Sequence, residues 1–182
     1  MAEVKNDYEI RGNVTAIFLN KKDGSILEAL ISTEDLAKVQ EFPNTWYAGV
    51  TRADYTAYVV GWIQRSDRSR IHSYLHRWIL DTPEGLVVDH INHDGLDNRR
   101  ENLRIATKGD NQHNRKGAQR NNKSSGIRGV SWHKKTQKWQ AQIKLNGKKI
   151  YLGLYKDLND AKHAAEEGRA KYMPYSKEAG WI

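Results

Sequence analysis

The stretch Val87–Arg115, VVDHINHDGLDNRRENLRIATKGDNQHNR, decides the fold. It gathers three His, four Asp and several Asn residues in a short segment. An apolar start, the turn signal His93-Asp94-Gly95 and a second apolar run at Leu103–Ile105 predict a strand, a loop and another strand. The polar residues that follow, up to Asn114, predict a helix. The segment is therefore expected to fold as two strands and a helix that bring oxygen donors and imidazoles together.

The chemistry that suits this set of side chains is phosphodiester hydrolysis. A carboxylate such as Asp89 and an amide oxygen such as that of Asn111 are hard ligands that suit Mg²⁺ or Mn²⁺. A neutral imidazole such as His90 can take a proton from water, while a divalent metal neutralises the phosphate. Since neighbouring strand residues face opposite sides, Asp89 and His90 reach one phosphate only if their strand ends there.

The segment resembles the HNH nuclease family, whose fold is the ββα-metal finger. The resemblance rests on Asp89-His90, on Asn102 twelve positions after His90, and on Asn111 nine positions further on. It covers residues 72–116. It implies that His90 is the general base, that Asp89 and Asn111 hold the metal, and that Asn102 pins the loop and orients His90. The family's final His is replaced here by Asn111, as in the homing-endonuclease branch.

Taken one at a time, these residues also have purely structural interpretations. His90 fits a structural or surface histidine, Asn102 fits a turn residue, and Asn111 fits a solvated helix residue. Their joint spacing favours the nuclease. Arg77, in the pair His76-Arg77, is either a phosphate contact or a surface charge, and the sequence leaves both interpretations open.

Composition and charge favour a nucleic-acid partner. The chain has 182 residues, a net charge of +8 and a pI near 9.6, which favours a polyanion. From Asn111 through Lys156 it has twelve Lys or Arg and no Asp or Glu, although mixed signs are the norm on a surface. It has no cysteine, which excludes disulfide partners and thiolate zinc sites. No apolar run long enough to span a membrane and no signal peptide are visible, so a cytoplasmic protein without a membrane partner is expected.

The first half of the chain is expected to form an α+β platform followed by the nuclease core. In the platform, residues 1–70, a β-hairpin over 8–32 would turn at Lys22-Asp23-Gly24. A helix would follow, capped by Thr33 with Asp35 nearby. The nuclease core is predicted to span residues 71–116. It is too short to hold a stable core alone, so we expect it to pack against the platform.

The second half is expected to form a basic linker and a second folded domain. The linker is predicted at residues 117–125, which are rich in Gly, Ser and Asn. Residues 126–175 predict a three-stranded antiparallel sheet packed on one helix, with a hairpin turn at Asn146-Gly147. The fold class of the whole chain is predicted to be α+β.

In this second domain, alternation along the strands sorts the side chains onto two faces. Trp132 and Trp139 are expected to pack in the core. The outer face would hold amide, basic and aromatic groups without a carboxylate, and such a sheet can enter the major groove of DNA. Its members would be Ser131, His133, Gln140, Gln142, Lys144, Lys149 and Tyr151. For Gln140 and Gln142 the alternative is a solvated polar face.

The second domain is similar to the plant Apetala-two/ethylene-response-factor DNA-binding domain. The similarity rests on Arg128-Gly129-Val130, on the run Trp139 to Lys144, on Leu152-Gly153 and on three helix alanines. It implies that double-stranded DNA is the partner. The positions that it assigns to DNA contacts are Arg128, Ser131, His133, Gln142, Lys144, Lys149 and Tyr151. Several plant arginines are replaced here by Ser, His or Lys, so the plant target sequence does not carry over.

The function predicted from the sequence is a metal-dependent DNA endonuclease with a C-terminal targeting module. The resemblance suggests that a phage or mobile intron encodes it and that it acts in the host cytoplasm, with its oligomeric state left open. Two alternatives remain. The first is a DNA-binding regulator whose nuclease has decayed, and the second is a protein that binds RNA through the same basic sheet.

Overall fold

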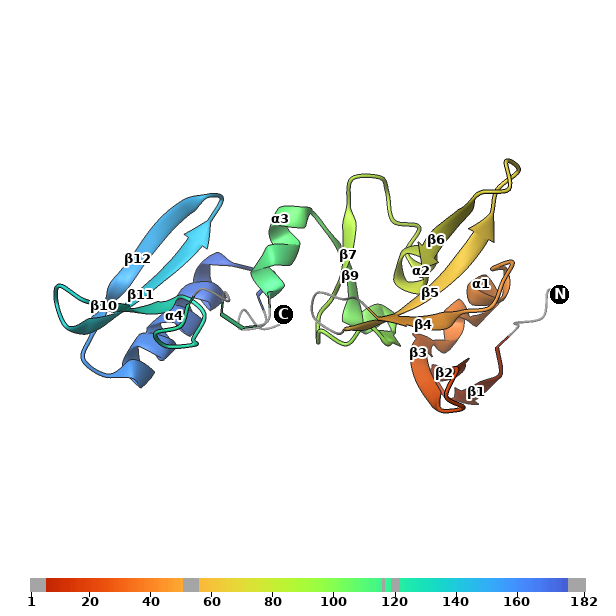
Figure 1. Ribbon diagram of the computed structural model, residues 1–182, viewed down its shortest axis with the longest axis horizontal. Helices are drawn as coiled ribbons and strands as arrows, with labels where there is room; N and C mark the ends of the chain where they lie inside the picture. The colour runs from red at the N-terminus through yellow and green to blue at the C-terminus, as the bar shows by residue number, and fades with distance from the viewer. Residues whose placement is uncertain (1–5, 51–55, 116, 119–121, 177–182) are drawn as a thin grey trace. The chain divides into compact units, whose positions relative to one another are not determined.

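The computed structural model describes residues 6–50, 56–115, 117–118 and 122–176. The chain divides into two compact units, Met1–Thr107 and Lys108–Ile182, which are described separately (Figure 1). Both units combine strands with helices, so the predicted α+β class is confirmed. Among the described residues, no helix is both long and apolar enough to cross a membrane. Positions 119–121 of the predicted linker lie outside the described residues.

The first unit contains a four-stranded sheet in the order β1-β2-β3-β8. Its strands are β1 (Tyr8–Arg11), β2 (Val14–Asn20), β3 (Ile26–Ser32) and β8 (Asp97–Asn98). β2 and β3 pair antiparallel from Val14↔Ser32 to Asn20↔Ile26, which confirms the predicted hairpin. β8 pairs in parallel with β3 through Leu30↔Asp97 and Ile31↔Asn98. A loop of the predicted finger thus adds a strand to the sheet of the platform.

The helix after β3 is confirmed, but the predicted cap is wrong. A 3₁₀ turn, Thr33–Asp35, leads into α1 (Leu36–Gln40), and Ser32 occupies the N-cap without a side-chain hydrogen bond. Thr33 Oγ1 donates to the carbonyl oxygen of Gly12 at 2.9 Å. Asp35 accepts hydrogen bonds from the Arg100 guanidinium at 2.6 and 3.0 Å. Thr33 and Asp35 therefore contact residues that are distant in the sequence. A local capping pattern cannot predict such contacts.

A second sheet in the first unit has the order β4-β5-β6. It consists of β4 (Tyr47–Val50), β5 (Ala57–Gln64) and β6 (Arg70–Tyr74), and it leads into α2 (Leu75–Ile79). Phe42 stacks on the buried Trp46 with ring centroids 3.8 Å apart. A Cβ at Gly61 would lie 2.3 Å from the Phe42 ring, so only glycine fits there. The two sheets share one core, which comprises Ile17, Leu19, Ala29, Ile31, Val39, Phe42, Trp46, Val59, Leu75, Ile79 and Leu103.

The predicted finger strands belong to this first unit. β7 (Val87–His90) pairs antiparallel with β9 (Leu103–Ala106), and a 3₁₀ turn, Arg100–Asn102, precedes β9. Leu103 is a member of the shared core, and Val88 and Leu96 pack against it. The strands that carry the candidate catalytic residues are therefore held by the apolar core of the platform.

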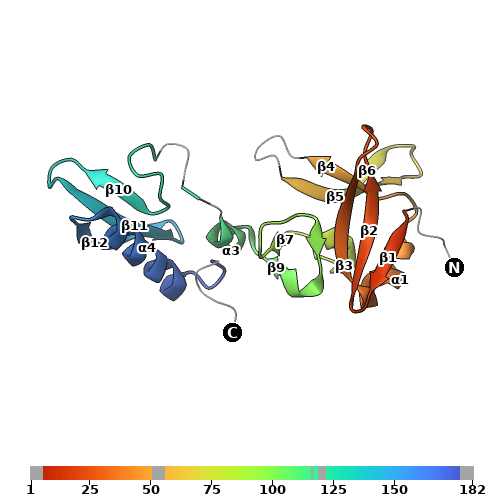
Figure 2. The same cartoon turned by 90° about the horizontal axis from the view of Figure 1, so that it is seen from below.

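The second unit begins with α3 (Lys108–Asn111) and a 3₁₀ turn, Gln112–Asn114. An antiparallel sheet of β10 (Val130–His133), β11 (Lys138–Leu145) and β12 (Lys148–Tyr155) follows, with α4 (Leu158–Tyr172) packed on it (Figure 2). This confirms the predicted three-stranded sheet on one helix. The turn at Asn146-Gly147 has positive φ at both residues, as a tight hairpin requires.

The core of the second unit is small and rich in alanine. Its buried members are Val130, Ala141, Ala161 and Ala165, and Trp139 packs against them. Trp132 meets the Trp139 ring edge to face at 4.8 Å. A Cβ at Gly168 would lie 2.5 Å from Leu152 Cδ1, so this glycine lets α4 lie close to the sheet.

Part of the segment expected to be a linker is bound to β10. The Asn122 side-chain amide donates to the carbonyl oxygens of Ile127 and Val130 at 2.8 and 2.7 Å. Ser125 Oγ donates to the same Val130 oxygen at 2.6 Å. These bonds order residues 122–125 against the sheet.

Candidate functional site

Asp89 and His90 lie at the end of β7, where the chain turns away from the strand. Each is 6% exposed. In the pairing of β7 with β9, Asp89 lies opposite Arg104 and His90 opposite Leu103. The backbone N–H of His93 donates to the His90 carbonyl at 3.0 Å, which closes a turn directly after the strand. The strand therefore ends at His90. This meets the condition under which the side chains of Asp89 and His90 can both reach one phosphate.

The carboxylate of Asp89 forms an ion pair with Arg104. Arg104 Nε and Nη2 both donate to Asp89 Oδ2, at 2.8 and 2.5 Å. Both side chains are nearly buried, so solvent screens this contact weakly. The sequence analysis did not anticipate the pair, because it depends on the register between β7 and β9.

His90 is held by an amide and by aromatic rings. Its Nε2 lies 3.3 Å from Asn98 Oδ1. Asn98 Nδ2 donates to the Gly95 carbonyl at 3.4 Å, so the amide turns its oxygen toward the imidazole. This orientation of the amide favours the tautomer of neutral His90 that carries its proton on Nε2. The rings of Tyr58 and His76 lie 5.7 and 4.9 Å from the His90 ring, measured between centroids.

The electrostatic environment keeps His90 neutral. Burial lowers its pKa below the ordinary value, and this effect exceeds the opposing influence of the Asn98 hydrogen bond and of Asp89. A neutral imidazole is the form that can accept a proton. The geometry and the protonation state both suit a general base at this position.

Asn102 holds the loop between the two strands at both ends. Its Oδ1 accepts from the backbone N–H of Asn92 at 2.9 Å, and its Nδ2 donates to the Asp97 carbonyl at 2.7 Å. The amide that contacts the His90 ring is that of Asn98, a residue to which the sequence assigns no role in the site. Asn98 reaches the site because β8 pairs with β3, and this two-residue pairing leaves no pattern in the sequence.

His76 forms a wall of the site. Its ring is 5.3 Å from that of Tyr74, between centroids, in a stacked arrangement. Burial lowers the pKa of His76 to about 3, and His90 and Arg77 act in the same direction. Within the described part of the chain, its Nδ1 is buried and has no hydrogen-bond partner.

Two arginines with predicted DNA contacts are engaged inside their own units. The Arg77 guanidinium donates to the carbonyl oxygens of Leu86 at 2.8 Å and Thr82 at 3.3 Å, so it braces the loop before β7. Arg128 Nη1 donates to the carbonyls of His113 and Arg115 at 2.9 and 2.8 Å. Both side chains have a structural use that the sequence did not reveal.

Asn111 is the last residue of α3 and belongs to the second unit. Asp89 belongs to the first unit, so their joint role as metal ligands remains a prediction. Among the described residues, no three His, Cys, Asp or Glu side chains are grouped to hold a metal. A site made of one carboxylate, one amide oxygen and phosphate or water ligands needs no such group. The chemistry of the donors therefore fits a hard divalent cation.

The outer face of the sheet in the second unit gathers the predicted DNA contacts in cross-strand rows. Ser131 lies opposite Gln140, Gln142 opposite Tyr151, and Lys144 opposite Lys149. Tyr151 is 58% exposed, and both lysines are exposed. His133 lies at the end of β10, where its Nδ1 is 2.7 Å from Thr136 Oγ1.

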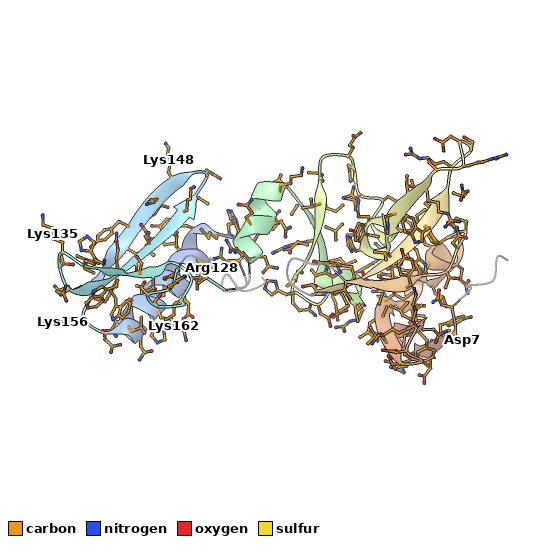
Figure 3. The ribbon with its side chains drawn as sticks, in the orientation of Figure 1. Asp7, Arg128, Lys135, Lys148, Lys156 and Lys162 are labelled. Atoms are coloured by element: carbon orange, nitrogen blue, oxygen red, sulfur yellow. The ribbon has the colours of Figure 1, made fainter. Side chains whose placement is uncertain are left out.

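Basic side chains also extend from the turns of this sheet. Figure 3 shows Lys135 and Lys148 projecting from the β10–β11 and β11–β12 turns, away from the body of the second unit. Lys144 and Lys149 face one another across the strands although like charges in this position destabilise a sheet. A polyanionic ligand would relieve this repulsion.

Comparisons with known proteins agree with both resemblances. A family model described as HNH endonuclease matches residues 73–113, and one described as AP2 domain matches residues 125–173. The arrangement of an HNH segment followed by an AP2 domain is therefore confirmed. Protein 3.8 of Escherichia phage T7 is 35% identical over 66 residues, which are 36% of this chain and 53% of that protein. The chain thus spans about half the length of the curated relative it matches. No solved structure matches the chain.

Proposed function

We propose that the protein is a metal-dependent endonuclease that nicks or cleaves double-stranded DNA and holds its substrate with the AP2 domain. The observation that carries the proposal is His90, a buried imidazole kept neutral at the end of β7 beside the Asp89 carboxylate. The phage relative supports a phage or mobile-element origin and action in the host cytoplasm.

In the proposed reaction, His90 takes the proton of the attacking water. The nitrogen that accepts it is Nδ1, because Asn98 fixes the proton on Nε2. Asn102 keeps the loop closed through Asn92 and Asp97, and this holds Asn98 at the ring. Proton transfer by a positioned base contributes about 10²–10⁴-fold to a rate.

Asp89 and Asn111 are the residues that would hold Mg²⁺ or Mn²⁺. When bound, such an ion neutralises the phosphate and stabilises the leaving oxygen. Arg104 fixes Asp89 Oδ2, and this limits the rotation of the carboxylate. In the second unit, Lys144, Lys149 and the other outer-face residues would contact phosphates and groove edges, which gives affinity and modest specificity.

The decisive experiment incubates supercoiled plasmid with the full chain in Mg²⁺, in Mn²⁺ and in EDTA. The wild type is expected to nick the plasmid only with metal, and His90→Ala is expected to abolish nicking. His163→Ala is the matched control, because His163 is an exposed histidine on α4. Metal binding has a separate readout: Mn²⁺ titration followed by electron paramagnetic resonance should show weaker binding in Asp89→Asn.

The second candidate is a DNA-binding regulator without catalysis. The observation that favours it is the Asp89–Arg104 ion pair, which already balances the charge of the carboxylate. On this hypothesis the wild type binds duplex DNA and cleaves none in any metal, and His90→Ala behaves identically. A preference for RNA in competition would favour the RNA-binding alternative.

A further inference from the structure

The β5–β6 hairpin carries a continuous polar and aromatic face. The cross-strand pairs Gln64↔Arg70, Trp62↔His72 and Val60↔Tyr74 lie along it. The rings of Trp62 and His72 are 3.5 Å apart between centroids, and Trp62 and Tyr74 are each 37% exposed. Figure 1 shows the tip of this hairpin extending beyond the other elements of the first unit. Aromatic rings that are in contact with one another and open to solvent are candidates for a binding surface.

The same hairpin concentrates positive charge. Arg65, Arg68 and Arg70 are all exposed, and no carboxylate among the described residues forms an ion pair with them. The acidic residue at the tip, Asp67, accepts a hydrogen bond from the backbone N–H of Ser69 at 2.8 Å. Most other described arginines of the first unit are paired with carboxylates, namely Arg11, Arg99, Arg100 and Arg104.

The backbone conformation at the tip of the hairpin favours a binding role for the side chain of Arg68. Arg68 has φ +65°, in the left-handed region that glycine normally occupies. An L side chain in this region strains the backbone. A long cationic residue kept at such a position is better explained by what its charge contacts than by the stability of the turn.

The face of the hairpin leads to the candidate catalytic residue. Tyr74, at the base of β6, stacks on His76 with ring centroids 5.3 Å apart. His76 in turn lies 4.9 Å from His90. A phosphate backbone that passes His90 and continues over Tyr74 would therefore meet Trp62, His72 and then the arginines.

We infer that the β5–β6 hairpin is a duplex-DNA contact in its own right, holding the phosphates that flank the cleaved bond. This inference rests on the proposed function for the position of the cleaved phosphate at His90. The basic tip binds the backbone by charge, and Trp62 and Tyr74 provide flat, partly apolar surfaces beside it. The platform then contributes to substrate binding in addition to supporting the finger.

The test measures binding of the full chain to duplex DNA in EDTA over a range of salt concentrations. Two variants are compared with the wild type: Arg68→Gly, and a triple variant with Arg65→Ser, Arg68→Gly and Arg70→Ser. Each lost phosphate contact should reduce the slope of log K against log salt by about 0.9, so the triple variant should lose up to about 2.7. Lys22→Ser, at the tip of the β2–β3 hairpin, is the control for net charge and should leave the slope unchanged.

Arg68→Gly separates a binding role from a structural one. Glycine suits φ +65°, so the melting temperature should stay the same or rise while affinity for DNA falls several-fold. A triple variant with the wild-type slope, or a loss no greater than that of Lys22→Ser, would overturn the inference. Absence of duplex binding by the wild type, or tighter binding to RNA that depends on the same arginines, would also overturn it. Failure of the plasmid assay alone would refute the nuclease and leave this binding result standing.

Discussion

At the scale of single residues, the proposed role of His90 as a base should depend on Asn98. Asn98 is fully buried and joins the Gly95 carbonyl to His90 Nε2. We predict that Asn98→Ala lowers the nicking rate by about tenfold or more, because the imidazole loses its orientation and its preferred tautomer. Asn98→Asp keeps an acceptor oxygen and should recover part of the rate.

Single-turnover rates and DNA affinity, measured separately, check this prediction. Affinity for DNA should be the same in all three proteins, since Asn98 is buried. If Asn98→Ala cleaves as fast as the wild type, or if Asn98→Asp is no faster than Asn98→Ala, then Asn98 does not position the base.

His76 makes the stability of the protein depend on pH. The pKa of His76 is about 3 in the folded protein against an ordinary value of 6.5, so between these pH values the unfolded chain binds more protons. Stability should therefore fall as pH drops below 6.5, by about 1.4 kcal/mol per unit of pH. Between pH 7.5 and pH 5, we predict that the wild type loses about 2 kcal/mol more than His76→Phe.

Urea unfolding at both pH values measures this difference. At pH 7.5, His76→Phe should be as stable as the wild type or more stable, because it removes a buried polar nitrogen that lacks a partner in the described structure. An equal loss of stability in the two proteins would show that His76 is protonated in the folded state.

At the scale of elements, the sequence predicted the structures that are made by local pairing. The β2–β3 and β11–β12 hairpins both follow from alternation around Asp23-Gly24 and Asn146-Gly147, where the turn itself brings the partner strand. The sequence likewise predicts a helix after the sheet, and in the structure Asp157 caps α4 by accepting from the backbone N–H groups of Asn159 and Asp160. Each of these signals lies within a few residues of the structure that it predicts.

Elements that depend on distant partners were not predictable. β8 has two residues, and it forms by pairing with the edge of β3, which lies more than sixty positions earlier in the chain. The Asp89–Arg104 pair and the Asn98–His90 contact need registers that no local pattern encodes. The family pattern therefore predicts roles for His90 and Asn102 but does not reveal which residues contact them in the structure.

At the scale of the whole molecule, the proposed general base and the proposed contact face of the AP2 domain lie in different units. His90 and its neighbours belong to the first unit, and the outer face of the β10–β12 sheet belongs to the second. Two weak sites on one chain gain affinity because each raises the effective concentration of the other's ligand. Changes on the outer face of the β10–β12 sheet should thus alter affinity for DNA without altering the rate at saturation.

Lys144 and Lys149 offer a sharp test of this division. They face one another across β11 and β12, and replacing both by Gln removes a like-charge pair, which should stabilise the sheet by a few tenths of a kcal/mol. The same double variant should bind duplex DNA more weakly, with a salt slope reduced by about 1.8 for two lost phosphate contacts. Higher stability with lower affinity would indicate that the lysines are kept for the ligand.

The control for this last experiment is Lys162→Gln on α4, which removes an exposed lysine from a helix of the same unit. It should leave the slope at the wild-type value. At saturating DNA the double variant should nick at the wild-type rate, because His90 and its surroundings are intact. If the double variant binds DNA with unchanged affinity, the outer face is not the docking surface. If it binds normally but nicks slowly, the separation of roles is contradicted.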